Sequence, residues 1–413
     1  MTGTRVTPLE PGFDPALPEL PLALDPDRAA RLVAPGAQVR RARRHDTKYE
    51  PGRSCVSAYE LELADGSRAF AMVAVTPRGL QIQPLEADEG LPGLAEALDP
   101  ARMAARFAAL GPGSIAPRRG GAVGWCTVVP VRYKPGARCV LRYQLGPDGR
   151  RCYGKLLAGG CRQQVATLAA LRDGGSRSMP EILPVEACWD DLGLLVQPAV
   201  DDADELNQVA FDPQVAAAAR QGLLRAAGAG LAGLHAAAPP QAPPAPLAAD
   251  LADLRGLLPP LAHADQDLAG RYQAVLARLQ APTADPGGRL AAGHGAFRTD
   301  QFLIRRRSGA LVLIDLDSAC LAEPARDLGN FLAYLDWKAI RRPQLAAEVA
   351  GAAAAFTRGY GSVLPWPAAE RVALWRAASL LKIAGRRYRS LTVSEWHLVP
   401  RLVDAAAALL AGL

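Results

Sequence analysis

A predicted β-hairpin in the second half of the chain carries the residue types best suited to metal and phosphate chemistry. Its strands are the apolar runs 302–304 and 311–314, and the Ser-Gly pair between them is typical of a hairpin turn. The hairpin brings five polar side chains to one end of a small sheet: His294, Asp300, Gln301, Asp315 and Asp317. An ionised carboxylate such as Asp315, at the end of a buried strand, is costly unless a cation or hydrogen-bond donors face it. The pattern therefore predicts a metal ligand at Asp315, and the alternative is a capped turn.

The same stretch resembles the phosphotransfer core of aminoglycoside phosphotransferases and choline kinase-like enzymes, which are relatives of the protein kinases. In that family a His-Gly-Asp catalytic loop that ends in Asn precedes a strand that ends in a metal-binding Asp. His294-Gly295, Gln301 and Asp315 stand at the family spacing, and residues 327–331 resemble the start of the helix that follows. Ala296 stands where the family has its catalytic Asp. The resemblance implies phosphoryl transfer with ATP and Mg²⁺ as cofactors.

The resemblance also implies roles for the polar residues of this loop. Gln301 replaces the family's Asn as a metal ligand, because its carbonyl oxygen reaches a magnesium ion with one more methylene. His294 orients the loop through hydrogen bonds. Without a carboxylate at position 296, the candidates for the catalytic base are Asp300 and then Asp317. Loss of the base need not abolish transfer, because the loose transition state needs little early proton removal and a general base contributes roughly 10²–10⁴-fold.

A strand-rich segment before the hairpin supplies candidates for nucleotide binding. Lys155, on the third strand of that segment, would pair with the α- and β-phosphates; a solvated lysine on an edge strand is the other interpretation. A turn with Gly136 between Lys134 and Arg138 takes the place of the family's glycine-rich loop, and its two cations would bind phosphate. A plain hairpin turn explains the same residues equally well. Gln197, which precedes a proline, resembles the linker between the two lobes of a kinase.

This strand pattern has an earlier counterpart in the chain. Residues 48–75 and 132–159 each contain a strand, a Pro-Gly turn, a second strand, a tight turn and a third strand. The shared positions are Tyr49 with Tyr133, Pro51-Gly52 with Pro135-Gly136, Cys55-Val56 with Cys139-Val140, and Tyr59 with Tyr143. Internal duplication is the natural interpretation, and one continuous mixed sheet is the alternative. Met72 aligns with Lys155, and a helical pattern over 91–113 lies between the two copies.

Together these patterns predict an α+β fold of the two-lobed, protein kinase-like kind, with an additional N-terminal α+β segment that repeats the hairpin of the N-lobe. The expected divisions are a lead-in at 1–38, the N-terminal segment at 39–118, the N-lobe at 119–200 and a helical C-lobe at 201–413. Within the C-lobe the apolar periodicity predicts helices over 215–235, 247–257, 267–280, 327–340, 344–360, 368–388 and 399–410.

Composition narrows the class of protein. The chain has 413 residues and is half apolar, so it has material for two or three packed units. With 47 basic and 41 acidic residues, the net charge of +6 is spread along the chain and does not predict nucleic-acid binding. Seven cysteines at irregular spacing indicate neither a disulfide framework nor a zinc site, and no apolar run predicts a signal peptide or a membrane span. We therefore expect a cytoplasmic protein; its oligomeric state is not predicted.

The leading functional hypothesis is an ATP-dependent phosphotransferase that acts on a hydroxyl of a small molecule, such as an aminoglycoside, a sugar or an amino alcohol. The alternative is a pseudokinase that binds nucleotide or a protein partner without turnover. Ala296 favours this alternative, as does the helix after Lys155, which offers Gln163 and Gln164 but no Glu to pair with the lysine. Nucleotidyl transfer on the same fold is a third possibility, for which no residue gives a positive signal.

Overall fold

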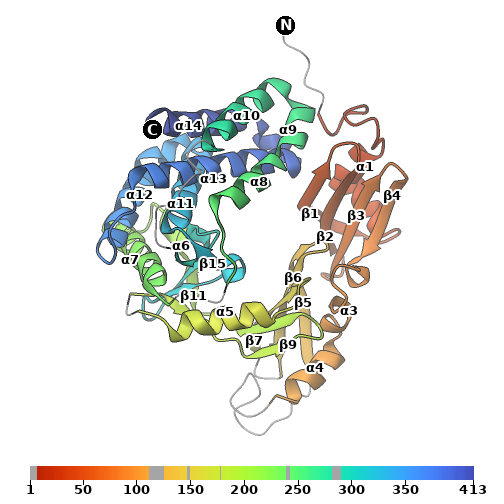
Figure 1. The fold of residues 1–413 in the computed structure, drawn as a ribbon. Helices are drawn as coiled ribbons and strands as arrows, with labels where there is room; N and C mark the ends of the chain where they lie inside the picture. Colours follow the sequence, from red (N-terminus) through yellow and green to blue (C-terminus); the bar gives the residue numbers. More distant parts are fainter. Residues whose placement is uncertain (1–6, 111–124, 147–148, 177, 239–241, 281–289) are drawn as a thin grey trace.

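The computed structural model combines two sheet-containing units with a large helical body, as Figure 1 shows. It describes residues 7–110, 125–146, 149–176, 178–238, 242–280 and 290–413. The two-lobed α+β prediction is therefore confirmed, and the additional N-terminal unit lies beside both the helical body and the N-lobe sheet. Among the described residues, no helix has the length and apolar character needed to cross a bilayer.

The first sheet is antiparallel and has the order β1-β2-β3-β4. Its strands are β1 (Val39–Glu50), β2 (Ser54–Leu63), β3 (Arg68–Thr76) and β4 (Gly79–Pro84). The second sheet has the order β5-β6-β7-β10-β9. Its strands are β5 (Cys126–Lys134), β6 (Arg138–Leu145), β7 (Arg150–Leu157), β9 (Ala187–Trp189) and β10 (Leu194–Pro198). The pattern shared by the two copies thus belongs to two separate sheets and not to one continuous mixed sheet.

Each sheet carries two short helices that precede it in the chain. These are α1 (Leu20–Leu24) and α2 (Pro26–Val33) for the first sheet, and α3 (Leu94–Ala97) and α4 (Pro100–Ala108) for the second. Tyr59 donates its hydroxyl hydrogen bond to the carbonyl of Ala23 in α1, and Tyr143 does the same to Ala97 in α3. The duplication therefore includes the helices, and residues 91–110 belong to the second copy, while 111–113 of the predicted helical segment lie outside the described residues. We propose that the first copy ends near Pro84, not at residue 118.

A buried aspartate braces the first turn of each sheet. Asp14 accepts hydrogen bonds from the Tyr49 hydroxyl at 2.7 Å and from the Gly52 amide at 2.8 Å. Asp88 accepts the equivalent bonds from the Tyr133 hydroxyl and the Gly136 amide at the same distances. Both glycines have positive φ, which the tight turn requires. Within the expected lead-in, 1–38, the described residues 7–38 thus supply a brace and two packed helices.

The register of the strands changes one alignment between the copies. In the second sheet Lys155 pairs with Val140, and in the first sheet the equivalent residue, Val56, pairs with Ala74. Met72, which the sequence alignment placed opposite Lys155, is two positions away because β2 is longer before its turn. The first copy therefore has a buried alanine, Ala74, at the position where the second copy has the cation of Lys155.

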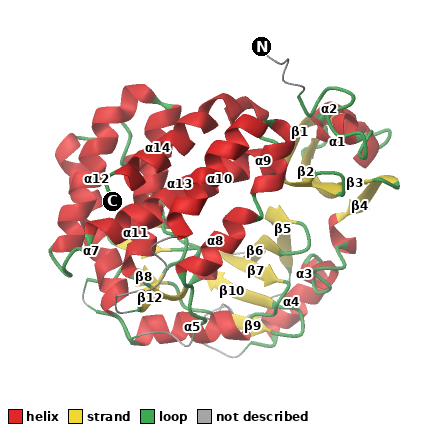
Figure 2. Ribbon diagram, turned by 45° about the horizontal axis from the view of Figure 1, so that its top comes forward, coloured by secondary structure: helices red, strands yellow, loops and turns green. Residues whose placement is uncertain are grey.

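The helical body surrounds a small third sheet, as Figure 2 shows. That sheet has the order β11 (Ala203–Glu205), β13 (Phe302–Arg305), β14 (Leu311–Leu313) and β8 (Glu181–Ile182), and β12 (Ala291–Gly293) pairs with β15 (Cys320–Ala322). The helices are α5 (Arg162–Asp173), on the N-lobe side, and α6 (Leu206–Val209), α7 (Ala217–Ala236), α8 (Leu247–Arg255), α9 (Leu258–Ala264), α10 (Gln266–Gln280), α11 (Pro324–Arg341), α12 (Ala346–Gly361), α13 (Ala369–Arg389) and α14 (Val399–Ala411). The predicted hairpin is β13–β14, which lies at the centre of this body.

The first copy is also docked on the helical body. β1 contacts α9 and α13, and the Phe13 ring lies 5.0 Å from the His263 ring, centroid to centroid. Arg44 donates a hydrogen bond to the carbonyl of Leu391, just after α13. Tyr49, Tyr59 and Val73 of the first copy consequently share one apolar core with the C-lobe helices. Ala58 and Phe70, in contrast, pack in the apolar core of the N-lobe.

The two aspartate braces give a matched test of the duplication. Asp14→Ala and Asp88→Ala should each lower the free energy of unfolding by about 1–3 kcal/mol, because each leaves a buried tyrosine hydroxyl and a turn amide without their acceptor. Urea unfolding followed by tryptophan fluorescence measures this, and Glu89→Ala, at an exposed position beside Asp88, is the control. Losses no larger than that of the control would contradict the assigned role.

Candidate functional site

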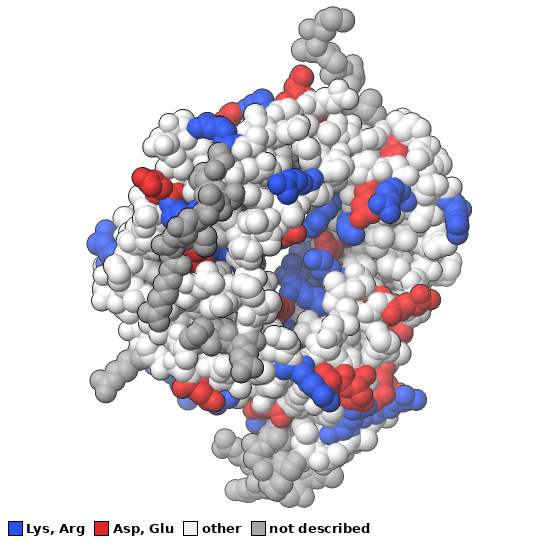
Figure 3. Space-filling model, in the orientation of Figure 1, with Lys and Arg blue, Asp and Glu red and all other residues white. Residues whose placement is uncertain are grey.

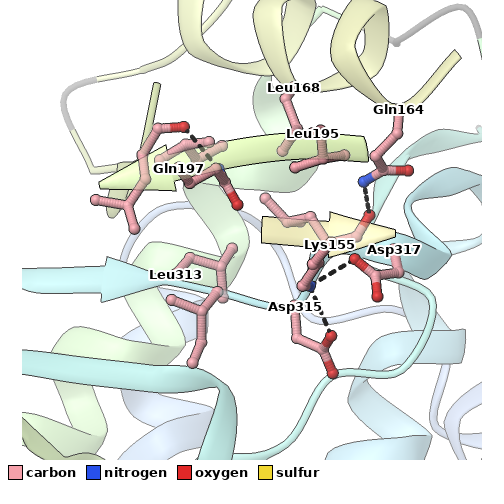
Figure 4. Close-up of a pocket in the computed structure, with 12 residues that line it drawn as sticks. Lys155, Gln164, Leu168, Leu195, Gln197, Leu313, Asp315 and Asp317 are labelled. Carbon is pink, nitrogen blue, oxygen red and sulfur yellow. Dashed lines mark hydrogen bonds and ion pairs between the residues drawn. The ribbon is translucent and has the colours of Figure 1, made fainter. Parts of the chain in front are cut away.

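The predicted site residues of the two lobes meet in one charge cluster (Figure 4). Lys155 Nζ, on β7, lies 3.0 Å from Asp315 Oδ1 and 2.6 Å from Asp317 Oδ1. Arg138 Nη1, at the start of β6, lies 2.5 Å from Asp317 Oδ2 and 3.7 Å from Asp315 Oδ1. Two cations of the N-lobe therefore face two carboxylates of the C-lobe. Lys155 is not a solvated lysine, because its side chain is only 17% exposed.

Local backbone geometry places both carboxylates on the same side. The strand β14 ends at Leu313, and Asp315 has a left-handed conformation with φ of 63°, which a short polar residue tolerates best after glycine. The turn Leu316–Ser318 follows, so the strand does not continue to Asp317. Burial opposes ionisation of Asp315, but Lys155 and then Arg138 outweigh it and hold the pKa of this carboxyl well below its usual range. Asp315 is therefore ionised at neutral pH.

The oxygen atoms of Asp315 and Asp317 fit a hard divalent cation. Magnesium takes carboxylate oxygens and usually needs only one or two from the protein. Among the described residues, no group of three or more His, Cys, Asp or Glu side chains forms a denser site. Gln301 fits less well, because its Oε1 accepts a hydrogen bond from the Arg298 amide at 2.7 Å and its buried Nε2 has no partner among the described atoms. Asp315 and Asp317 would thus hold the metal, and Gln301 would do so only by sharing its oxygen with that amide.

An apolar slot lies beside the charge cluster. Leu168 of α5, Leu195 of β10 and Leu313 of β14 line it, as Figure 4 shows. Gln197 closes one end by donating a hydrogen bond to the Leu183 carbonyl at 3.0 Å. The cavity measures about 10 Å³, which is room for about one water molecule. A nucleotide base would therefore enter only if these walls, which come from both lobes, moved apart.

The helix α5 contacts the acid hairpin without a glutamate. Gln164 donates a hydrogen bond to the Leu316 carbonyl at 2.7 Å. Lys155 does not need a glutamate on α5 as its partner, because Asp315 and Asp317 already face it. In this conformation the two aspartates thus pair with Lys155, and Gln164 joins α5 to the turn that carries them.

The turn before β6 does not present its glycine amide to a ligand. The Gly136 amide donates to Asp88, and Lys134 is exposed at the end of β5 with no carboxylate within 4 Å among the described residues. Arg138 is the residue of this turn that reaches the acidic pair. The structure therefore brings Arg138 into the cluster and leaves Lys134 outside it.

The buried carboxylate of Asp327 holds the loop of residues 294–301. It accepts hydrogen bonds from the amides of His294 at 2.6 Å and Gly295 at 2.9 Å, and its Oδ2 lies 3.3 Å from His235 Nε2. Asp327 lies inside α11, which begins at Pro324 after the N-cap Glu323 and so starts three residues before the predicted helix. Burial opposes its ionisation, but the hydrogen bond with His235 and the charge of Arg326 lower its pKa.

His294 and Gly295 are fixed by the surroundings of the loop. Burial lowers the pKa of His294, so the ring is neutral at pH 7, and its Nε2 lies 3.1 Å from the Ile314 carbonyl, to which it donates. This contact ties the loop to the residue before Asp315 and suits the orienting role expected of His294. At Gly295 φ is 81°, and a Cβ would lie 2.0 Å from the Ser318 carbonyl oxygen. Glycine is therefore required here.

The two candidate bases lie in different surroundings. Asp300 is exposed and pairs with Arg298, with Oδ1 3.0 Å from Nε, whereas Asp317 is committed to Lys155 and Arg138. Ala296 lines a cavity of about 280 Å³ on the loop, and Asp300 is not part of its lining. Both assignments remain predictions.

Sequence reasoning missed the residues that surround Ala296 in this cavity. Arg298 donates a hydrogen bond to the Tyr334 hydroxyl at 3.3 Å and lies over its ring at 4.8 Å. Burial opposes ionisation of Tyr334, but Arg298 and Arg386 lower its pKa below the usual value. Arg298 was visible in the loop sequence, but nothing in the helical pattern of α11 and α13 distinguished Tyr334 or Arg386 from other surface residues.

Asp327→Asn tests the brace of the loop. The amide cannot accept from both backbone N–H groups, so the free energy of unfolding at pH 7 should fall by about 3 kcal/mol or more. The lowered pKa of Asp327 means that its stabilisation is complete above about pH 4, the unfolded value, and is lost as the pH falls through the folded value. The difference in free energy of unfolding between the wild type and Asp327→Asn should therefore shrink below about pH 4.

Urea unfolding between pH 7 and pH 3 measures this difference. Asp404→Asn is the matched control, because Asp404 is 66% exposed and pairs with Arg271 at the surface. A difference that stays constant over this pH range, or one no larger than the control's, would refute the role of Asp327.

Known proteins resemble this chain only distantly in sequence. No curated protein matches the chain. Among solved structures, a macrolide 2'-phosphotransferase type I is 17% identical, covering 75% of this chain and 97% of its own, with a TM-score of 0.46. A choline/ethanolamine kinase family protein from Mesorhizobium loti is 18% identical, with coverages of 75% and 98% and a TM-score of 0.45. An amicoumacin kinase in complex with AMP-PNP, Ca²⁺ and Ami is 12% identical, with coverages of 75% and 95% and a TM-score of 0.49.

The sequence itself provides the assignment to a family. The model of the phosphotransferase enzyme family matches residues 143–366, which is more than half of the chain. The matched range includes Lys155, the loop of His294, the acidic pair and Asp327. The chain therefore belongs to the phosphotransferase enzyme family.

Proposed function

We propose that the protein transfers the γ-phosphate of ATP to a hydroxyl of a small molecule. The observation that carries the proposal is the contact of Lys155 and Arg138 with Asp315 and Asp317 across the two lobes. Phosphoryl transfer needs positioned cations and metal-binding carboxylates more than it needs covalent chemistry from the protein. This cluster contains both kinds of group, next to the loop that Asp327 holds.

The cations and carboxylates of the cluster could exchange each other for the phosphates of ATP and a magnesium ion. In the structure the two cations neutralise the two carboxylates. A magnesium ion at the carboxylates would supply positive charge that stabilises the transferring phosphoryl group. Lys155 and Arg138 would then be free to bind phosphate oxygens, Lys155 as a compact cation and Arg138 through its planar fork.

Removal of the acceptor proton is the less demanding part of the reaction. Asp317 stays a candidate base, and Asp300 would have to leave Arg298 to act. Tyr334, whose pKa Arg298 and Arg386 lower against the effect of burial, is a further candidate beside Ala296. Because the transition state is loose, we expect the rate to depend more on the cations than on any one of these groups.

The alternative, a nucleotide-binding protein without turnover, is favoured by Ala296, which leaves the loop without its usual carboxylate. The apolar slot, closed to about 10 Å³, would have to open for a nucleotide in either function. Turnover, not binding, therefore separates the two.

The proposal predicts magnesium-dependent ATP binding that requires the cluster. Asp315→Asn and Lys155→Met should abolish the rise in melting temperature that ATP with Mg²⁺ causes in the wild type. ATP consumption, measured as ADP release against neutral, cationic and anionic hydroxyl compounds, should fall about 10²-fold or more in both variants, because each removes charge stabilisation at the phosphates.

Asp202→Asn and Lys48→Met are the matched controls, since both side chains are exposed and pair with residues outside the cluster, Arg307 and Glu50. They should retain wild-type binding and turnover. Binding of ATP without turnover on any acceptor would favour the alternative function, and the absence of magnesium-dependent ATP binding would rule out both.

A further inference from the structure

The cavity beside Ala296 differs in character from the rest of the site. It measures about 280 Å³, and its walls come from the loop of residues 294–301, Ser318 in the turn after Asp317, α11, α13 and Asp253 of α8. The Ala296 side of the loop faces this cavity, whereas Asp315 and Asp317 line the slot on the N-lobe side. Its volume is slightly below that typical of pockets for drug-sized ligands, about 300–1,000 Å³. It therefore suits a small ligand or one end of a larger one.

The lining of this cavity is dominated by positive charge. Four basic side chains contribute to it: Arg298, Arg326, Lys382 and Arg386. Asp253 is the one carboxylate among the described lining residues, and its side chain is 70% exposed. An exposed carboxylate is well screened by water, so it offsets little of the charge of the half-buried cations.

Carboxylates behind the wall do not cancel this charge. The buried Asp250 is shared by Arg326 at 3.0 Å and Lys382 at 2.9 Å, and Lys382 also lies 3.8 Å from the exposed Asp253. Asp300 pairs with Arg298 but is itself exposed. Arg386 is half-buried, and no carboxylate lies within 4 Å of it among the residues that the structure describes. Arg386 is thus a cation that faces the cavity without a counter-charge.

The basic groups also gather over a wider area. Figure 3 shows Lys and Arg side chains within the hollow at the centre of this face, between the first copy and the helical body. The charge of Arg386 acts on its neighbours. Burial and then Arg386 lower the pKa of Arg389, and Arg386 also helps to lower the pKa of Tyr334. A concave site with an excess of one charge attracts small ligands of the opposite charge.

We propose that the cavity binds an anionic group, a carboxylate or a phosphate, of the molecule whose hydroxyl is phosphorylated at the loop. This inference rests on the proposed phosphotransfer function and specifies its acceptor class as hydroxy acids or sugar phosphates. Arg298 and Arg386 would bind the oxyanion through charge-assisted hydrogen bonds. A polycationic aminoglycoside would meet four like charges and is disfavoured.

Inorganic phosphate is the simplest probe of the cavity. Sodium phosphate should raise the melting temperature of the wild type above that measured in sodium chloride of equal ionic strength, and should still do so when Mg²⁺-AMP-PNP is present. Arg386→Gln should weaken the apparent phosphate affinity about tenfold, the usual result of losing one charge-assisted contact. Arg386→Lys keeps the charge and should retain most of the affinity.

Arg307→Gln is the control of equal charge change, because Arg307 is 95% exposed on the β13–β14 turn and outside the cavity. It should bind phosphate as the wild type does. An equal effect of phosphate and chloride, an undiminished phosphate effect in Arg386→Gln, or loss of the effect on addition of Mg²⁺-AMP-PNP would each overturn the proposal.

Calorimetric titration of the nucleotide-loaded protein then separates the two oxyanions. Gluconate or glucose 6-phosphate should bind at least tenfold more tightly than glucose, and whichever binds more tightly identifies carboxylate or phosphate as the anchored group. Kanamycin, a polycation, should not bind; tighter binding of kanamycin or glucose would contradict the inference.

The outcomes distinguish this inference from the proposed function. Arg386-dependent anion binding without any ATP turnover would leave the anion site in place and refute phosphotransfer. Turnover on neutral or cationic acceptors alone would support phosphotransfer and refute the anionic acceptor.

Discussion

A single buried carboxylate, that of Asp327, holds the parts of the C-lobe that the site depends on. It belongs to α11, accepts from two consecutive amides of the loop and contacts His235 of α7, whose Nδ1 lies 3.0 Å from the Tyr360 hydroxyl of α12. Burying such a charge is favourable only because donors surround it on all sides. The loop conformation is therefore a condition of the fold of the helical body, and the positions of Ala296 and Arg298 follow from it.

The charge cluster between the lobes, unlike Asp327, is partly open to solvent. Lys155 and Arg138 meet Asp315 and Asp317 through side chains that are between 13% and 29% exposed. Interactions of this kind are strong enough to orient the lobes but remain open to competition from ions and ligands. The closed slot and the paired charges together indicate a conformation in which the groups of the site satisfy one another. Ligands would act by replacing these internal partners.

The duplicated α+β unit illustrates how one architecture serves two purposes. Both copies keep the aspartate brace, the turn glycine and the tyrosine contact to a helix, because these hold the unit together. Only the second copy has a cation opposite the acidic pair, since Ala74 occupies the place of Lys155 in the first. The first copy instead packs on α9 and α13, beside the cationic hollow.

The amino-acid sequence alone determined the features that depend on local pattern. The hairpin β13–β14, most helices of the C-lobe and the repeated strands follow from periodicity and turn residues, which act within a few positions of the chain. The sequence also contains the repeat of the helices, as the Asp-Pro pairs at 25–26 and 99–100. It was hard to recognise because the number of residues between the helix and the next strand differs between the copies. Tertiary structure alone decided that Ala74, not Met72, matches Lys155, since strand register depends on pairing across the sheet. It also decided the cationic cavity, because Arg298, Tyr334 and Arg386 come from three segments and only their packing brings them together.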